Sequence, residues 1–486
     1  MYRAMICKRS KLSLARSIIF IFCFIVVMYL WKRKPNEEAI KSKKWTSLVL
    51  KDSNIILDIF TEETNKNQVV EKNVNELKDI DGQLDHQQKI RNVEKLPERR
   101  PNLVELDNQY VTRKAMVNNE NKLKEVVRRL NLQQKIRNME KFPQRSQNSI
   151  VIAVQVHKRA NYLSKLLQSL REANGISDAL LIISHDYYSN EINNIVHNVD
   201  FCQVLQIFFP YSEQLNPDKF PGSDPNDCPR DLSKTEARAM GCNNAEYPDS
   251  YGHYREVKFT MTKHHWWWKI NRIFKDLWVT RNHRGLVLLL EEDHYVAPDF
   301  YKVLQKAYHV KQTDPLCREH ACDIVTLGDY RPIRNFHVEN SRIVRIQPWV
   351  STKHNMGMAL DKKTWEKIIE CGDMFCKYDD YNWDWSLMRM SLRCFSKPLK
   401  VLLFRSPRVF HLGTCGLHHR NSNCDINMVL DRTKEIIEQS NEVLNPSFLK
   451  VELARPWIQG YIGQPNGGWG DKRDHDLCLN FTISTN

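Results

Sequence analysis

The pattern of apolar and polar positions changes near residue 149. Beyond it, short and almost wholly apolar runs alternate with segments in which apolar residues recur every three or four positions. The short runs predict strands buried on both faces, and the longer spacing predicts helices. The predicted strands are Ile150–Val156, Ala179–Ser184, Gln203–Phe209 and Leu286–Leu290. The leucines of the first helical face are Leu163, Leu166, Leu167 and Leu170.

Strands that alternate with helices predict βαβ units and a mostly parallel central sheet, so the expected fold class is α/β. The chain contains neither Gly-x-Gly-x-x-Gly nor a Walker loop. Dinucleotide oxidoreductases and P-loop enzymes hold phosphates with those glycine-rich loops, so neither class is indicated. A phosphate-bearing substrate therefore needs another holder, such as a metal ion.

The segment Lys263–Lys269, which reads Lys-His-His-Trp-Trp-Trp-Lys, is predicted to open a long helix with Trp266, Ile270, Ile273 and Leu277 on one side. Its tryptophans are expected in the core. His264 and His265 are adjacent and point to different sides of a helix, which argues against one metal bound by both. A zinc hydrolase built on this pair also lacks a third ligand at suitable spacing.

Before residue 148 the chain is mostly polar, and residues 35–147 are expected to form a stem. The segment Gln87–Pro97 recurs there, with small changes, as Gln133–Pro143. Two copies do not make a solenoid, which needs three or more. A duplicated stem segment is the interpretation we adopt.

The apolar segment Ser17–Trp31 is short for a bilayer span and is followed by Lys32, Arg33 and Lys34. This exit lacks the small residues of a signal-peptidase site, so an uncleaved signal anchor is expected. The expected organisation is a cytosolic tail at 1–16, a transmembrane anchor at 17–34, a stem at 35–147 and a catalytic domain at 148–486.

The net charge of +14 arises from 72 basic and 58 acidic residues. Residues 1–34 contain eight of the basic residues and no acid, which leaves 14 − 8 = +6 for the rest. Most of the basicity therefore flanks the apolar segment, and a nucleic-acid partner is not indicated.

Of the 13 cysteines, Cys7 and Cys23 lie near the N-terminus and eleven lie between Cys202 and Cys478. No Cys-x-x-Cys pair occurs, so disulfides in an oxidising lumen are favoured over a metal site. Eleven is odd, and Cys202 beside a predicted strand is the candidate for the unpaired thiol. Asn480 begins an Asn-Phe-Thr glycosylation sequon, which agrees with a lumenal C-terminus.

The run Leu286–Leu290 leads directly into Glu291, Glu292 and Asp293. Ligands of open α/β sheets bind at the carboxyl ends of strands. Three carboxylates there suit a hard cation such as Mg²⁺ or Mn²⁺ that holds a phosphate-bearing substrate. An acidic surface loop after a core strand is the alternative, and the motif alone leaves both interpretations open.

Two further stretches contain candidate chemistry. Asp384 lies between Trp383 and Trp385, where desolvation raises its proton affinity and suits it to act as a general base. The aromatic neighbours also suit a sugar, although a solvated acidic loop is the alternative. His411 lies shortly before Cys415 and could ligate a metal, but a lone histidine is usually structural.

Several of these motifs, in this order, resemble the N-acetylglucosaminyltransferase II family. The resemblance covers roughly residues 125–486, so the stem repeat lies mostly outside it. The matching segments are Lys263–Lys269, Glu291–Tyr295, Ala297–Tyr301, Tyr378–Trp385 and Gly467–Asp471.

The resemblance implies a GT-A, Rossmann-like glycosyltransferase that uses UDP-GlcNAc and Mn²⁺. It further implies a single-pass type II protein of the Golgi membrane with a lumenal catalytic domain. The implied reaction adds GlcNAc in β1,2 linkage to the terminal α1,6-linked mannose of N-glycans and commits them to the complex type. A sister enzyme for another mannose arm and a catalytically silent mannose-binding lectin are the alternatives.

Residue roles follow from the same resemblance. Asp293 is implied as the direct metal ligand, His411 as the second protein ligand and Asp384 as the catalytic base. Met261 departs from the glutamine of the family pattern and is left out. The implied donor contacts are Gln155, Val156, His157, Lys158, Arg159, Asp186, Thr262, Lys263, His264, His265 and Arg334. The implied disulfides are Cys228–Cys242, Cys317–Cys322, Cys371–Cys394, Cys376–Cys478 and Cys415–Cys424.

Overall fold

The computed structural model describes residues 120–142, 145–146, 148–330, 337–413, 425–454 and 463–483. The expected cytosolic tail, membrane anchor and most of the stem lie outside these residues, as does the first copy of the repeat. Within the described part of the chain, no helix has both the length and the apolar character that crossing a bilayer requires.

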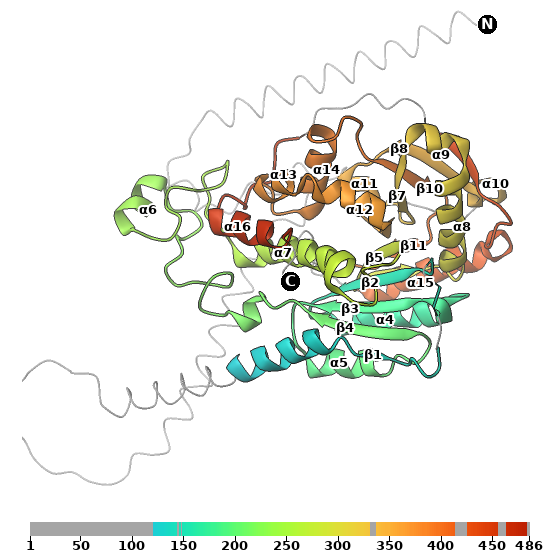
Figure 1. The fold of residues 1–486 in the computed structure, drawn as a ribbon, viewed down its shortest axis with the longest axis horizontal. Helices are drawn as coiled ribbons and strands as arrows, with labels where there is room; N and C mark the ends of the chain where they lie inside the picture. The colour runs from blue at the N-terminus through green and yellow to red at the C-terminus, as the bar shows by residue number, and fades with distance from the viewer. Residues whose placement is uncertain are drawn as a thin grey trace, which may run out of the picture. The chain divides into compact units, whose positions relative to one another are not determined.

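A ten-stranded sheet runs through the centre of the described fold (Figure 1), with strand order β1-β4-β3-β2-β5-β9-β7-β10-β8-β12. A separate ribbon pairs β6 with β11 in antiparallel fashion. The strands are β1 Ile136–Arg137, β2 Val151–Val156, β3 Leu180–His185, β4 Gln203–Phe208, β5 Val287–Glu291, β6 His294–Val296, β7 Cys322–Thr326, β8 Ile343–Pro348, β9 Met358–Leu360, β10 Lys400–Phe404, β11 Val409–His411 and β12 Lys450–Leu453.

The sheet is parallel where the sequence pattern was clearest. Strands β4, β3, β2 and β5 are mutually parallel, and all four match predicted strands within one or two residues. The second half is mixed, because the short strand β9 lies antiparallel between β5 and β7, and β8 lies antiparallel to β10. The parallel strands β3, β2 and β5 have their carboxyl ends side by side at the same end of the sheet.

Helices flank this sheet (Figure 1). An unlabelled helix covers residues 120–133. The others are α4 Ala160–Arg171, α5 Asn190–His197, α6 Lys234–Met240, α7 Val257–Asn271, α8 Phe300–Thr313, α9 Pro315–His320, α10 Val338–Ser341, α11 Ser351–His354, α12 Lys362–Ile369, α13 Gly372–Lys377, α14 Trp383–Arg393, α15 Ile426–Gln439 and α16 Lys472–Asn480.

The two faces of the sheet bury different side chains of the same strands. Along β2, Ile152 and Val154 belong to a core cluster with α4, α5 and α8. Val151 and Ala153 belong to a second cluster with α7, α12, α13 and α14. This division follows from the two-residue period of a strand, and it explains why β2 is apolar at nearly every position.

The tryptophans of α7 form the centre of the second cluster, as expected. Trp266 stacks on Trp383 with ring centroids 4.3 Å apart, and Trp267 stacks on Phe375 at 4.2 Å. Helix α7 begins at Val257, earlier than the sequence pattern indicated, and a π-helical turn at Arg272–Asp276 follows it. The stacking fixes α7 against α13 and α14.

The folded domain begins before the expected boundary at residue 148. Val127 of the first described helix is almost completely buried against Phe208 and Leu215. Strand β1, which lies inside the second copy of the repeat, pairs with β4 at the sheet edge. This copy is therefore part of the fold rather than of a stem, because its Ile136 fills a place in the core.

Four disulfides occur in the described residues, and they are the pairs that the resemblance implied. They are Cys228–Cys242, Cys317–Cys322, Cys371–Cys394 and Cys376–Cys478. Cys202 is the buried free cysteine. The implied pair Cys415–Cys424 lies outside the described residues. Two of the four bridges hold α13, which immediately precedes the loop leading to Asp384.

Candidate active site

Polar side chains gather where β3, β2 and β5 end. Ser184, Gln155 and Glu291 occupy neighbouring register positions on these three strands. Each follows apolar residues that anchor its strand in the core, so the backbone that presents these side chains is fixed. The acidic triplet continues from β5 into the turn before β6.

Glu292 acts as a clamp rather than as a ligand. Its Oε1 accepts from Arg159 Nε at 2.7 Å, and its Oε2 accepts from the His157 backbone amide at 2.8 Å. The side chain is 2% exposed. Both oxygens of Glu292 are therefore engaged in holding the segment after β2 against the turn after β5.

Asp293 has a different environment. Its Oδ2 accepts from Arg159 NH1 at 2.8 Å and lies 3.3 Å from His411 Nε2. Its Oδ1 is buried and has no hydrogen-bond partner among the described residues. Burial opposes its ionisation, but His411 and Arg159 outweigh burial and hold the pKa of Asp293 well below its usual range. Asp293 is therefore an ionised carboxylate with one oxygen still able to bind.

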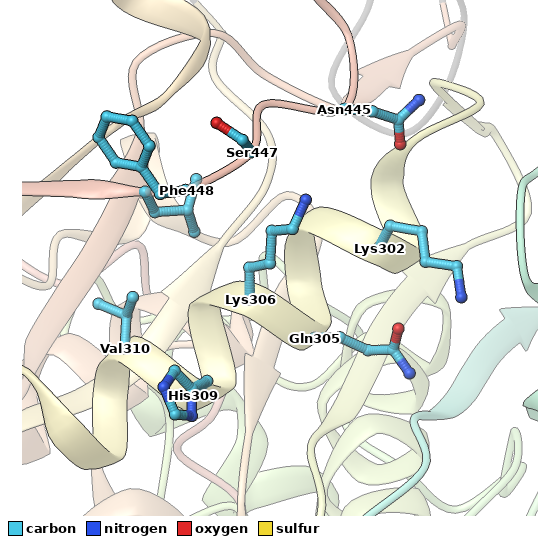
Figure 2. A pocket seen from close by; sticks show the side chains of 9 residues that line it. Lys302, Gln305, Lys306, His309, Val310, Asn445, Ser447 and Phe448 are labelled. Carbon is cyan, nitrogen blue, oxygen red and sulfur yellow. The ribbon is translucent and has the colours of Figure 1, made fainter.

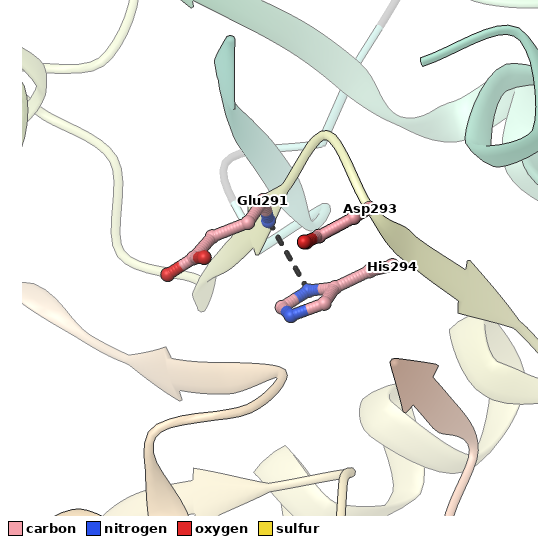
Figure 3. A group of neighbouring side chains, drawn as sticks. All are labelled: Glu291, Asp293 and His294. Carbon is pink, nitrogen blue, oxygen red and sulfur yellow. Dashed lines mark hydrogen bonds between the residues drawn. The ribbon is translucent and has the colours of Figure 1, made fainter. Parts of the chain in front are cut away.

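The residues around Asp293 fit a divalent metal ion. Glu291, Asp293 and His294 bring one ligand atom each within 4.8 Å of one another (Figure 3). Gly413 keeps space open, because a Cβ there would lie 2.5 Å from Asp293 Oδ2 and 2.9 Å from His411 Nε2. Carboxylate oxygen and imidazole nitrogen are both donors that divalent metal ions accept.

His411 is a better ligand candidate than His294. The Nδ1 of His294 accepts from the Glu291 backbone amide at 3.1 Å, and burial lowers the pKa of His294 to about 3. A neutral imidazole that accepts at Nδ1 carries its proton at Nε2 and has no lone pair left for a metal. The Nε2 of His411 lies 3.3 Å from Asp293 Oδ2, and its role as a metal ligand stays a prediction.

Several of the residues implied to contact the sugar donor lie around Asp186, which follows β3. Its Oδ1 lies 2.7 Å from His157 Nδ1, and its Oδ2 lies 3.6 Å from His265 Nδ1. Burial raises the proton affinity of Asp186, but these two histidines outweigh burial and lower its pKa. His157 remains exposed, beside Lys158, which lies over Tyr187. The result is an anionic side chain framed by groups that can contact a nucleotide.

Helix α7 packs against the carboxyl ends of β3 and β2. His265 Nε2 lies 2.8 Å from Ser184 Oγ, and Lys269, one turn later, donates to Gln155 Oε1 at 2.7 Å. Lys269 is 1% exposed, and burial lowers its pKa to about 7. Lys269 belongs to the recognised string but was not predicted as a site residue.

Two members of the implied donor set have their side chains inside the fold. Lys263 and His264 are fully buried on the side of α7 away from Asp186. Lys263 donates to the carbonyls of Tyr378 and Asp380, and His264 pairs with Asp474 at 2.9 Å. Both side chains therefore have partners inside the fold, and their implied contact with the sugar donor stays a prediction.

Three implied donor contacts remain, namely Val156, Thr262 and Arg334. The Val156 side chain is completely buried, so only its backbone is available, and its carbonyl already accepts from the Asp186 amide. Thr262 is half-buried on α7, and its contact stays a prediction. Arg334 lies outside the described residues.

Asp384 lies in the first turn of α14, behind the buried and stacked Trp383. Its Oδ2 accepts from Asn355 Nδ2 at 2.9 Å, and its Oδ1 accepts from the Trp385 amide at 3.0 Å. Burial, together with the charges of Asp380 and Glu291, raises the pKa of Asp384 to about 7. This agrees with the desolvation predicted for an aspartate between two tryptophans.

A short series of contacts joins Asp384 to the acidic turn. The Asn355 side chain is within hydrogen-bonding reach of both Asp384 and the Tyr330 hydroxyl. The ring centroid of Tyr330 lies 6.3 Å from that of His411. Burial and the charges of Glu291, Asp384 and Asp293 raise the pKa of Tyr330, so the phenol stays neutral. Sequence reasoning missed Asn355 and Tyr330, because neither belongs to a motif.

A hollow of about 480 Å³ lies elsewhere, between α8 and the segment before β12 (Figure 2). Lys306 donates to the Pro446 carbonyl at 2.6 Å, and Lys302 lies against Gly175. Among the described residues that line this hollow, none is a carboxylate that could pair with His309 for acid–base work. The candidate catalytic side chains therefore lie at the carboxyl ends of β3, β2 and β5 and not in this hollow.

Comparisons with known proteins place this chain in a family. The sequence profile of the family N-acetylglucosaminyltransferase II (MGAT2) matches residues 124–478. An alpha-1,6-mannosyl-glycoprotein 2-beta-N-acetylglucosaminyltransferase of Sus scrofa is 49% identical over 334 residues, which cover 68% of this chain and 73% of that protein. The enzyme of the same name from Rattus norvegicus is 48% identical over 338 residues, covering 68% and 74%.

Solved structures are more distant. The mannosyltransferase PcManGT from Pyrobaculum calidifontis, in complex with GDP-Man and Mn²⁺, is 8% identical and covers 76% of this chain and 81% of that chain. Its TM-score is 0.26, a value too low to carry an argument about this protein.

Proposed function

The chain belongs to the N-acetylglucosaminyltransferase II family, and on this premise we propose how its site carries out the reaction. The enzyme transfers N-acetylglucosamine to the α1,6-linked mannose arm of N-glycans. The donor we propose is UDP-GlcNAc, the product linkage is β1,2, and transfer depends on Mn²⁺. The observation that carries this proposal is a base candidate, Asp384, that is separate from the metal candidate Asp293 and has a raised pKa.

The metal would be held by Asp293 and His411. When bound, Mn²⁺ neutralises the charge that develops on the departing diphosphate. His411 and Arg159 keep Asp293 ionised, and the contact with Arg159 at 2.8 Å orients the carboxylate. Glu292 also accepts from Arg159 at 2.7 Å. The guanidinium is therefore held in place, where it can stabilise negative charge on the diphosphate.

Asp384 takes the proton from the 2-hydroxyl of the terminal α1,6-linked mannose. The hydroxyl oxygen then bonds to C1 of GlcNAc, and the bond from C1 to the diphosphate oxygen breaks. Attack from the face opposite the leaving group converts the α configuration into β in one displacement. A base with a pKa of about 7 is ionised in half of the molecules near neutral pH and still has useful proton affinity.

Asn355 orients this base. Its Nδ2 donates to Asp384 Oδ2. The proton is therefore accepted by the other carboxylate oxygen, Oδ1, whose position is set by the first turn of α14. The Oδ1 of Asn355 is buried and has no partner among the described residues. An acceptor-sugar hydroxyl that donates to Oδ1 would satisfy it, because a buried acceptor without a partner costs free energy.

We further propose that the catalytic domain is lumenal and attached to the Golgi membrane by a single-pass type II anchor. The apolar segment Ser17–Trp31 supports the anchor. The disulfides support an oxidising compartment. Asn480 is exposed at the end of α16, where a glycan would be accommodated.

Defined N-glycans test the reaction directly. The purified chain is supplied with UDP-GlcNAc and biantennary precursors whose α1,3 arm is either capped by GlcNAc or bare, with Mn²⁺ or with a chelator. We expect one GlcNAc in β1,2 linkage on the α1,6-linked mannose, and no product with the chelator. Product on another mannose would indicate the sister enzyme, and glycan binding without turnover would indicate a lectin.

A further inference from the structure

The loop that leads to Asp384 is tied to the C-terminal part of the chain by three carboxylates. Three aspartates accept from the consecutive segment Asn466–Trp469. Asp380 binds the Asn466 amide at 2.9 Å, Asp249 binds the Gly468 amide at 2.7 Å, and Asp379 binds the Trp469 amide at 3.1 Å. We call this arrangement of Asp249, Asp379 and Asp380 on residues 466–469 the carboxylate clasp.

Asp380 is the member of the clasp closest to the base in sequence. Its Oδ1 accepts from the backbone amide and the side chain of Asn382, at 2.9 and 3.0 Å. Its Oδ2 accepts from the backbone amide and the side chain of Asn466, both at 2.9 Å. Asp380 is completely buried, and burial raises its pKa, but each oxygen accepts two hydrogen bonds, which favour the ionised carboxylate.

Asn382 is the N-cap residue of α14, and Asp384 lies in the first turn of the same helix. Asp380 therefore holds the residue at which the helix of the base begins. Its carbonyl accepts from Lys263 Nζ at 2.9 Å and from Ser386 Oγ at 3.3 Å, which joins the turn to α7 and to α14.

We propose that Asp380 is a positioning residue for Asp384: by bridging Asn382 and Asn466, it sets where the proposed base lies relative to the metal site. This inference rests on the proposed function of Asp384. Displacement of a reacting group by about 1 Å can cost on the order of a hundredfold in rate, so such a bridge matters for catalysis.

Asp380 has a second effect, through its charge. The titratable groups that interact with Asp384 are Asp380 from its own loop, Glu291 from β5, and the phenols Tyr330 and Tyr381. Lys263 faces Asp380 and Asp379 from α7, and burial lowers its pKa to about 7. Asp380 is the acid with the larger influence on Asp384, ahead of Glu291, and its negative charge raises the pKa of the base.

The test is the pH dependence of kcat for the full chain with saturating metal and donor. We expect Asp380→Asn to lower kcat by about ten- to a hundredfold and to move the inflection to lower pH by about half a unit or more. Asp380→Glu keeps the charge but alters the geometry, so kcat falls while the inflection stays near the wild-type value. The KM for the donor stays within about twofold in both variants, because the metal ligands are unchanged.

Asp249→Asn is the matched control. This substitution alters the clasp contact at 2.7 Å. Asp249 is not among the groups with the largest influence on the pKa of Asp384. We expect a lower melting temperature and an unchanged inflection. If Asp249→Asn alters kcat and the inflection as strongly as Asp380→Asn does, general loosening explains the effect and the inference is wrong. A wild-type kcat and inflection for Asp380→Asn would also overturn it.

Asn466→Ala is used if Asp380→Asn does not fold. It removes one side-chain bond to Asp380 and retains the carboxylate charge. A severalfold fall in kcat with an unchanged inflection supports positioning, and an unchanged kcat contradicts it. Asp384→Asn separates this inference from the proposed function: a wild-type rate for that variant rejects the base itself, whereas loss of transfer leaves only the role of Asp380 under test.

Discussion

Asn355 donates from Nδ2 to Asp384 Oδ2 over 2.9 Å, so the proposed base is held by a neutral amide at the end of α11. A cationic partner in the same place would keep the carboxylate ionised and make it a poor proton acceptor. The amide fixes direction without that electrostatic effect. Asn355 therefore orients the base, whose proton affinity is raised by burial and by the charges of Asp380 and Glu291.

The pH dependence of the reaction follows from Asp384. The group must be ionised to take a proton, and burial raises its pKa to about 7. We expect kcat to rise with pH through an inflection near 7 and to reach a plateau above it. A rate measured across roughly pH 5.5 to 8.5 that stays constant at fixed metal saturation would contradict the assignment.

Asn355→Asp places a second carboxylate beside the base. Two like charges in contact cannot both ionise easily, so the pKa of the pair rises. We expect the inflection of kcat to move to higher pH by about one unit and the rate at neutral pH to fall by about tenfold or more. Asn355→Ala is the control, since it removes the orienting bond without adding charge: kcat falls, and the inflection moves upward by less than in Asn355→Asp, because only one hydrogen bond to the carboxylate is lost.

Asp293→Asn removes the charge from the proposed metal ligand. The remaining His411 and Glu291 bind a divalent cation more weakly, so affinity for Mn²⁺ and for UDP in its presence should fall together, each by about tenfold or more. Calorimetric titration of both ligands measures this. Glu292→Gln is the comparison, because both oxygens of Glu292 are already engaged by Arg159 and the His157 amide. An equal loss of metal affinity in both variants would refute the distinction between them.

The stacked pair Trp266 and Trp383 provides a stability prediction. Trp266 is 2% exposed, and its ring lies 4.3 Å from Trp383. We expect Trp266→Ala to lower the free energy of unfolding by about 3–5 kcal/mol, measured by denaturant titration. Trp278 is 51% exposed, so Trp278→Ala should change it by about 0.5 kcal/mol or less. Similar losses in the two variants would show that stacking in the core is not the cause.

The parallel half of the fold could be predicted because its strands are buried on both faces. A run such as Ile150–Val156 has no other interpretation once helices follow it at regular intervals. Strand β9 was not predicted, because three residues flanked by polar segments give no periodic signal. Its antiparallel place beside β5 depends on partners far away in sequence.

The candidate site was predictable only where residues of one kind cluster locally. The triplet Glu291–Asp293 and the loop around Asp384 stand out as charges beside apolar residues. Asn355 and Tyr330 come from separate elements and meet Asp384 only through tertiary packing, so no spacing rule reveals them. Lys263 and His264 illustrate the opposite case. They lie within a recognised string, yet α7 turns them into the interior, toward Asp380 and Asp474.

The clearest measurement is transfer by Asp384→Asn, compared with its binding of UDP in the presence of Mn²⁺. The amide keeps the shape of the carboxylate but cannot accept the proton. We expect transfer to fall by about a thousandfold or more while UDP affinity stays within about twofold of wild type.

The same variant should be more stable than wild type. The folded pKa of about 7 lies above the ordinary value of 3.8, so the contribution of Asp384 to stability is full below about pH 4 and is lost as pH rises through about 7. Removing the charge should therefore add on the order of 2 kcal/mol at pH 8. Loss of transfer with retained UDP binding and a higher melting temperature is the predicted result. Transfer at the wild-type rate would contradict the division of labour between Asp384 and Asp293.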